Sequence, residues 1–141
     1  MATTFSAQHL SRITRRMPTL SVVDTVIVPA TTVLTTDDIL NLCTIPAFSV
    51  LAAIWIKVPD LDSGGPTLTM SVRDNVVPTV YLVDSTVGQA GGYITTDDLT
   101  TLGIVYSTEA LLQLIVTASA TAAQSTAQTI SFAALFALTK A

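Results

Sequence analysis

The run from Cys43 to Val58 is the most apolar and β-prone part of the chain, and it holds the only tryptophan, Trp55. In a strand, every second side chain lies on the same face. The β-branched and aromatic residues, and the stop at Pro59, favour a strand over a helix. We therefore predict a central strand here, with Pro46 at a bend just before it. One face is apolar and must be covered, and it would hold Phe48, Val50, Ala52, Ile54, Ile56 and Val58. The other face, with Trp55 and Lys57, is expected to be half covered.

Short β-prone runs separated by turn residues continue along the chain, which predicts an all-β fold of about eight strands, a sandwich or a barrel. In 67–73 the residues alternate, so that Leu68, Met70 and Val72 face inward. The Ala-rich stretch 118–138 fits a strand prediction least well. The predicted strands cover residues 20–28, 39–43, 48–58, 67–73, 79–83, 103–106, 111–117 and 128–138.

The chain has 141 residues, half of them apolar and 11% charged, which predicts one domain with an extensive core. So little charge leaves much uncharged surface, which is typical of surfaces that pack against other copies or a partner.

Charge is distributed unevenly along the chain. Arg12, Arg15 and Arg16 precede the first acidic residue, Asp24, whereas residues 19–141 carry three basic residues against ten acidic ones, a net charge of −7. We predict a basic N-terminal arm over residues 1–18, extended or with a short helix over 6–16, and a β-sandwich body over residues 19–141.

One cysteine, Cys43, excludes an intrachain disulfide, and its apolar surroundings predict a buried, unreactive thiol. The longest apolar run is interrupted by Pro46 and Lys57 and is too short to span a membrane. The arginines near the N-terminus are not followed by an apolar segment, as they would be in a secretory signal. We expect a protein made in a reducing cytoplasm, without a membrane partner.

Residues able to support catalysis or bind a metal are scarce. His9 is the only histidine and Cys43 the only thiol, so one chain cannot build a His/Cys metal site. A Ser-His-Asp site would depend on a histidine in the arm, which is a poor base. The run 60–64 begins like a calcium loop but lacks the later ligands, so a solvated turn is the favoured interpretation. We therefore predict no enzyme activity, no metal and no cofactor.

Three further motifs are interpreted as local structure. Thr-Thr-Asp-Asp occurs at 35–38 and again at 95–98. Its acids could pair around a cation across a trimer axis, but capped turns or solvated acids are favoured. The Gly-rich run 87–92 matches no nucleotide fingerprint and predicts a flexible loop. A weak internal repeat relates 36–42 to 108–114, because in both an acid precedes apolar residues that flank an amide. Equivalent strands in two facing sheets, or chance, would explain it.

The run Thr-Asp-Asp-Ile-Leu-Asn-Leu-Cys-Thr-Ile-Pro-Ala, followed by Val-Leu-Ala-Ala-Ile-Trp-Ile-Lys-Val, resembles a small virion protein of tailed bacteriophages. Thr-Leu-Thr-Met at 67–70, Gly-Gly-Tyr at 91–93 and the segment 108–116 follow in matching order. The likeness covers roughly residues 33–138. Two differences are that Phe48-Ser49 stands where the pattern has Gly-Thr, and that an Asp/Gly-rich continuation is missing after Thr67.

The resemblance implies a jelly-roll-like antiparallel β-sandwich with an extended N-terminal arm. It also implies a capsid decoration, or cement, protein that sits as a homotrimer on the outer capsid surface of the virion and bridges subunits of the major capsid protein. Two alternatives remain open: a tail or head-fibre component, and a carbohydrate-binding module. A sugar site needs exposed aromatic residues; the candidates are Trp55, Tyr81, Tyr93 and Tyr106, and Trp55 is expected to be buried.

The arm is the candidate docking element. Its apolar and arginine side chains could anchor it on an acidic protein surface, and a solvated tail is the alternative. Nucleic acid is not an expected partner, because three arginines on an acidic chain without interleaved aromatic residues make a thin binding footprint. The residues predicted to dock on the capsid are Phe5, Leu10, Arg12, Ile13, Arg15 and Arg16.

Overall fold

The computed structural model describes residues 19–77 and 79–139, and almost all of its regular structure is β-strand. Two 3₁₀ turns, η1 (Val87–Gln89) and η2 (Thr96–Asp98), are the helical segments of this part of the chain. No helix in the described part is long and apolar enough to cross a membrane. The strands are β1 (Thr19–Val28), β2 (Ile39–Ile45), β3 (Ser49–Val58), β4 (Thr69–Asp74), β5 (Val80–Ser85), β6 (Gly92–Thr95), β7 (Ala110–Ala118) and β8 (Gln128–Leu138).

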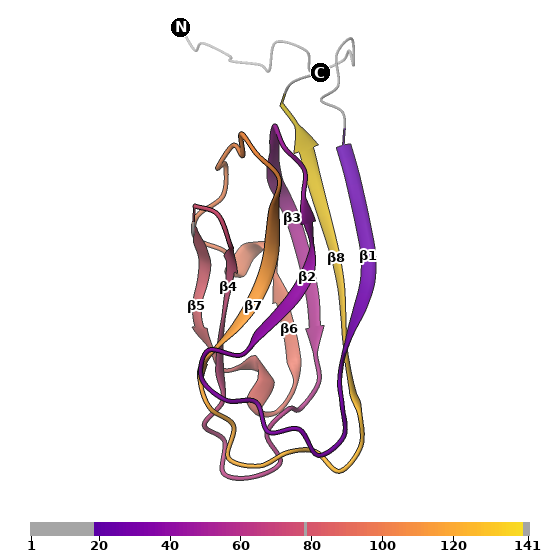
Figure 1. Cartoon of the computed structure of the whole chain (residues 1–141), viewed down its shortest axis with the longest axis vertical. Helices are drawn as coiled ribbons and strands as arrows, with labels where there is room; N and C mark the ends of the chain where they lie inside the picture. Colours follow the sequence, from indigo (N-terminus) through magenta and orange to yellow (C-terminus); the bar gives the residue numbers. More distant parts are fainter. Residues whose placement is uncertain (1–18, 78, 140–141) are drawn as a thin grey trace, which may run out of the picture.

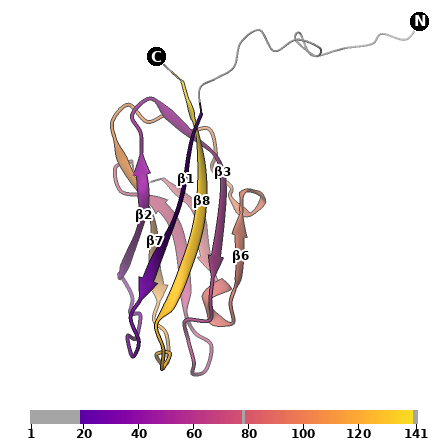
Figure 2. The same ribbon diagram turned by 90° about the vertical axis from the view of Figure 1, so that its right-hand side faces the viewer.

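The strands form two antiparallel four-stranded sheets that pack face to face (Figures 1 and 2). One sheet has the order β1-β8-β3-β6 and the other β2-β7-β4-β5. The first strand thus pairs with the last, the second with the seventh, the third with the sixth and the fourth with the fifth. This nested pairing, divided between two sheets, is the jelly-roll topology. The predicted all-β, jelly-roll-like sandwich of eight strands is confirmed.

The core lies between the sheets and is built from inward-facing residues of all eight strands, including Val28 at the end of β1. Met70, Val72, Leu112 and Leu114 of the two central strands β4 and β7 are completely buried. Phe132 and Phe136 of β8 fill the space opposite them. Burying a side chain of this size contributes roughly 1.5–3 kcal/mol to folding, so the alternation in 67–73 has direct energetic consequences.

The prediction for the central strand is correct only beyond Ala52. Ile54, Ile56 and Val58 face the core as expected, but the pairing of β3 with β8 shifts register between Leu51 and Ala53. A β-bulge places two residues opposite one and thereby moves the following side chains to the other face. Before the bulge the buried residues are therefore Ser49 and Leu51, whereas Phe48 and Ala52, predicted to be covered, are exposed.

One predicted strand is wrong and one strand was missed. Residues 103–106 form no strand, and only Tyr106 makes an isolated bridge to Ser49. The strand that was missed is β6 (Gly92–Thr95), which begins at the end of the Gly-rich run and pairs with β3. That run is not a flexible loop, because η1 occupies it and Gly88 is buried. A Cβ at Gly88 would lie 2.8 Å from Leu68 Cδ2 and 3.0 Å from Met70 Cε, so any larger residue here would force these two buried side chains to shift.

The two segments of the internal repeat, 36–42 and 108–114, are not arranged as predicted. They lead into β2 and β7, which are neighbours in the same sheet and not equivalent strands of facing sheets. The two amides, Asn41 and Gln113, lie opposite each other, and Gln113 Nε2 donates a 2.7 Å hydrogen bond to Asn41 Oδ1.

Candidate interaction surfaces

The parts of this molecule that could bind a partner are its exposed surfaces. Among residues 19–77 and 79–139, no three His, Cys, Asp or Glu side chains gather as a group that could hold a metal ion. Cys43 is half-buried, and burial, with the negative charge of Asp24, raises the pKa of its thiol to about 11. A thiol with so high a pKa is a weak nucleophile near neutral pH.

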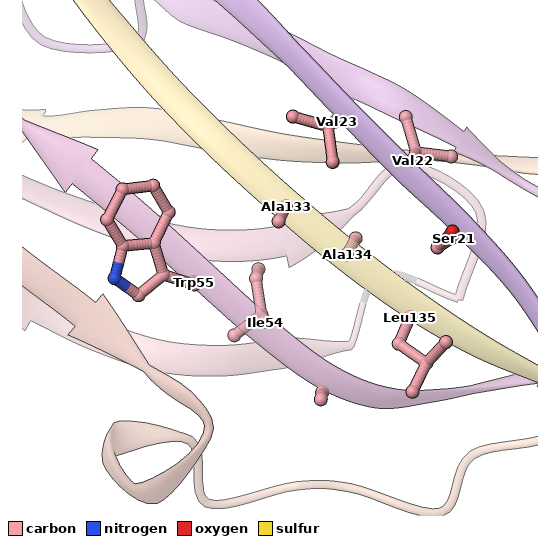
Figure 3. Close-up of a pocket in the computed structure, with 9 residues that line it drawn as sticks. Ser21, Val22, Val23, Ile54, Trp55, Ala133, Ala134 and Leu135 are labelled. Carbon is pink, nitrogen blue, oxygen red and sulfur yellow. The ribbon is translucent and has the colours of Figure 1, made fainter.

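The outer face of the β1-β8-β3-β6 sheet carries a shallow apolar groove of about 200 Å³ (Figure 3). Val23 of β1 and Trp55 of β3 lie on its two sides, and Ala133 of β8 pairs with both, between them. Alanine fills little space between two large neighbours, so the middle strand forms the floor. Among the lining residues, only Ser21 and the indole N–H of Trp55 offer polar side-chain groups.

Trp55 and Tyr93 form an exposed aromatic pair beside this groove. Their ring centroids are 5.5 Å apart and their planes are tilted by 37°. Trp55 is 41% exposed and Tyr93 56% exposed, so the expected burial of Trp55 is wrong. The other two candidate aromatics, Tyr81 and Tyr106, are buried. The sheet face therefore presents one aromatic platform.

The two ends of the sandwich differ in the loops that they carry. We call the end where β1 begins and β8 finishes the arm end, because residues 1–18 precede β1 (Figure 1). The β2–β3, β4–β5 and β6–β7 connections lie there. The other four connections form the far end. At the arm end, exposed apolar side chains stand on all three connections: Phe48, Val76, Val77, Leu102 and Val105.

Phe48, at the tip of the β2–β3 connection, has a left-handed backbone with φ of 57°. A large aromatic residue rarely adopts this conformation, which costs about 1–3 kcal/mol. Hydrogen bonds hold it in place, because its N–H donates to the Tyr106 carbonyl oxygen at 2.5 Å and its carbonyl accepts from the Thr139 N–H at 2.7 Å. The ring nonetheless remains 43% exposed.

A buried polar network shapes the β4–β5 connection at the arm end. The carboxylate of Asp74 accepts hydrogen bonds from the N–H groups of Val76, Val77 and Thr79 and from the Tyr106 hydroxyl. Burial alone would raise the pKa of Asp74, but these donors outweigh it and lower the pKa. The Tyr106 hydroxyl also shares a hydrogen bond with the Tyr81 hydroxyl. The two exposed valines thus stand on a rigid turn.

The far end is polar, and Asp62 is its central residue. Oδ1 accepts from the N–H groups of Gly64, Thr121 and Ala122, and Oδ2 from those of Thr67 and Leu68. The side chain is 2% exposed, so the predicted solvated turn is wrong at this residue. Burial raises its pKa, but the backbone donors outweigh this effect and lower the pKa to about 2. Its oxygens are thus engaged by the chain's own donors, not oriented toward a cation.

Both Thr-Thr-Asp-Asp motifs are capped turns, as favoured. Asp38 Oδ2 accepts from the N–H of Thr35 at 2.8 Å, and Asp98 Oδ2 accepts from the N–H of Thr95 at 2.7 Å. The same oxygens also accept from the two threonine hydroxyls, at 3.2 and 3.3 Å. Sequence reasoning identified these turns because the Thr-to-Asp spacing directly encodes the bond.

The six predicted docking residues all lie in residues 1–18, outside the described residues, so they remain predictions. The structure adds exposed apolar residues that sequence reasoning missed, chiefly Val76, Val77 and Val105. For Val76 and Val77 the available signal was their place between turn residues, where a β-prone run stops.

Comparison with known proteins links the fold to phage capsids. No family model and no curated protein matches this sequence. A chain of the cyanophage Pam1 capsid asymmetric unit has a similar structure, with a TM-score of 0.66, 25% identity, and coverage of 98% of this chain and 99% of that one. A chain of the capsid of Ralstonia phage GP4 shares the fold, with a TM-score of 0.58, 20% identity and 86% coverage of both chains. The predicted resemblance to a phage capsid-associated protein is confirmed, and the likeness supports a structural role in a virion and suggests a non-enzymatic one.

Proposed function

We propose that this chain is a capsid decoration, or cement, subunit that binds the outer surface of a phage capsid and bridges subunits of the major capsid protein. The observation that carries this proposal is the end-to-end structural likeness to a chain of the Pam1 capsid. A complete jelly roll with its own core suits a subunit that is added to a shell. Because binding only the assembled form stabilises that form, many bound copies would strengthen the shell.

In this proposal the arm anchors the subunit. Phe5, Leu10 and Ile13 supply apolar contacts, and Arg12, Arg15 and Arg16 pair with acidic groups on the capsid. The rest of the chain is acidic, so attraction to an acidic shell would be concentrated in the arm. A homotrimer on the outer face remains part of the proposal, because the large uncharged surface suits contacts between copies.

The test uses capsids that lack this chain, mixed with purified protein and separated by sedimentation. We expect the full chain to bind at a copy number comparable with that of the major capsid protein, measured by mass spectrometry. A chain without residues 1–18 contains the whole described core, so it should keep its thermal transition but lose binding. Full binding by the truncated chain would overturn the role of the arm.

Charge and apolar anchoring in the arm can be separated with matched variants. Replacing Arg12, Arg15 and Arg16 with serine should weaken binding more at low salt than at high salt, because ionic contacts are screened. The control is Lys57→Ser, which removes a basic residue of the body. Equal effects of the two changes would contradict an arm-specific role.

A second candidate function is carbohydrate binding, which the exposed Trp55–Tyr93 pair favours. Aromatic rings on a flat sheet can stack against the apolar face of a sugar ring, but the adjoining groove offers few hydrogen-bonding groups. Since Trp55 is the only tryptophan, oligosaccharide binding would quench or shift its fluorescence directly. Unchanged emission across a panel of bacterial surface glycans would exclude this function for the sheet face.

A further inference from the structure

Exposed apolar side chains in the connections between strands gather at one end of the sandwich. At the arm end these side chains are Phe48, Val76, Val77, Leu102 and Val105, which are 40–57% exposed. The connections at the far end contribute only Val33 among the described residues, at 42% exposure. Loop tips are normally polar, so the concentration of exposed apolar side chains at one end needs an explanation beyond chance.

The loops that carry these side chains are held rigidly and to one another. Asp74 accepts the N–H groups of Val76 and Val77 at 2.8 and 2.7 Å, and the Asn75 side chain accepts the N–H of Leu111 at 2.7 Å. The Phe48 N–H donates to the Tyr106 carbonyl oxygen, which ties the β2–β3 connection to the β6–β7 connection. A preformed apolar surface loses little conformational entropy on binding, so more of the free energy gained by burying it contributes to affinity.

The point where residues 1–18 join the body indicates what covers this surface. Residues 1–18 join β1 at Thr19, which pairs with Ala137 near the end of β8, at the arm end (Figure 1). Eighteen residues span at most about 60 Å when extended, so anything that residues 1–18 contact lies within that distance of Thr19. One partner can therefore contact both the arm and the apolar loops, whereas the far end faces away from it.

We propose that the arm end is the face of the body that docks on the capsid through its exposed apolar side chains, Val76 and Val105 among them. This inference rests on the proposed cement function and adds the orientation of the subunit. The partner is a shell surface with an apolar patch that receives the loops and acidic groups within reach of the arm. The far end, with its threonines, aspartates and glycines, then points to solvent.

The test compares Val76→Asp/Val105→Asp with Val33→Asp, an equally apolar and similarly exposed position at the far end. Both are measured in the full chain by sedimentation with capsids that lack it. We expect the double variant to bind at least about tenfold more weakly, and Val33→Asp to bind like the wild type. The reverse order, or equal binding by both variants, would overturn the orientation while leaving the cement function intact.

A footprinting measurement keeps the test valid if the double variant does not fold. Hydroxyl-radical labelling of the wild-type chain, free and capsid-bound, reports side-chain exposure by mass spectrometry. We expect Phe48, Leu102 and Val105 to lose labelling on binding and Val33 to keep it. Protection of Val33 alone would place the far end on the shell. A wild-type chain that does not bind capsids at all would reject the cement function itself, and the orientation with it.

Discussion

Asp62 and Thr121 are 59 residues apart in the chain, and the Thr121 N–H donates a 2.9 Å hydrogen bond to the Asp62 carboxylate. This bond joins the β3–β4 and β7–β8 connections at the far end. Further backbone donors from both connections converge on the same carboxylate, so a single buried acid organises the turn region.

We predict that Asp62→Asn lowers the free energy of unfolding by about 1–3 kcal/mol, because an amide N–H₂ would face backbone N–H donors. The pKa of Asp62 lies near 2 in the folded chain, below its ordinary value of 3.8. Its contribution to stability is therefore present above about pH 4 and is lost as the pH falls toward 2. Urea unfolding from pH 7 to pH 2 checks this, with Asp97→Asn as the control at an exposed acid. An acid-induced loss of the same size in Asp62→Asn and wild type would contradict it.

The Tyr106 hydroxyl is expected to stabilise the arm end. Tyr106→Phe removes the hydroxyl that donates a 2.8 Å hydrogen bond to the buried Asp74 carboxylate, and should cost about 1–3 kcal/mol at pH 7. Losing that donor moves the pKa of Asp74 back toward its unfolded-state value, so the stability that Asp74 loses on acidification should be smaller than in the wild type. Denaturant titrations at several pH values measure both effects. The control, Tyr93→Phe, removes an exposed hydroxyl, and a similar cost there would reject the network as the cause.

The left-handed backbone of Phe48 predicts an unusual order of substitutions. Asparagine tolerates positive φ, whereas a β-branched residue does not. Phe48→Asn should therefore be more stable than Phe48→Val by roughly 1–2 kcal/mol, although valine is more hydrophobic. Thermal unfolding of the two variants decides this. If Phe48→Val is the more stable protein, the backbone conformation is not a controlling factor at this position.

Cys43 should react slowly in the folded chain. Partial burial and the nearby Asp24 carboxylate raise its pKa from 9.0 to about 11. At pH 8 the reactive thiolate then falls from roughly one tenth to roughly one thousandth of the molecules. Iodoacetamide labelling should accelerate about a hundredfold or more on unfolding in urea. Asp24→Asn should raise the folded-state rate modestly and Asp37→Asn should not. Rapid labelling of the native wild type would contradict the raised pKa.

The positions of most strands could be predicted because short-range patterns encode them. The alternation of Leu68, Met70 and Val72 marks a strand with one buried face wherever that strand lies in the fold. The Thr-to-Asp spacing that ends at Asp38 and Asp98 likewise encodes a turn through bonds between residues three apart. Such features involve neighbours in the chain, so no knowledge of the partner strand is needed.

The errors arose where a distant partner decides the outcome. The bulge near Ala52 depends on how β3 pairs with β8, and it exposed residues that strict alternation would bury. Residues 103–106 have strand-forming side chains, yet only Tyr106 reaches a strand, through an isolated bridge to Ser49, and β6 pairs with β3 farther along at Trp55–Val58. Asp62 has the local sequence of a solvated turn, but donors from the β7–β8 connection enclose it.

The chain's own pattern of apolar and turn residues thus sufficed for an all-β body of about eight strands, because periodicity is a local property, whereas the basic arm over residues 1–18 stays a prediction. The pairing of β1 with β8, the gathering of apolar loop tips at one end and the exposure of Trp55 beside Tyr93 came only from the three-dimensional arrangement. Each of these depends on contacts between segments far apart in the sequence. Their formation is controlled by packing across the whole sandwich and not by the preference of any one segment.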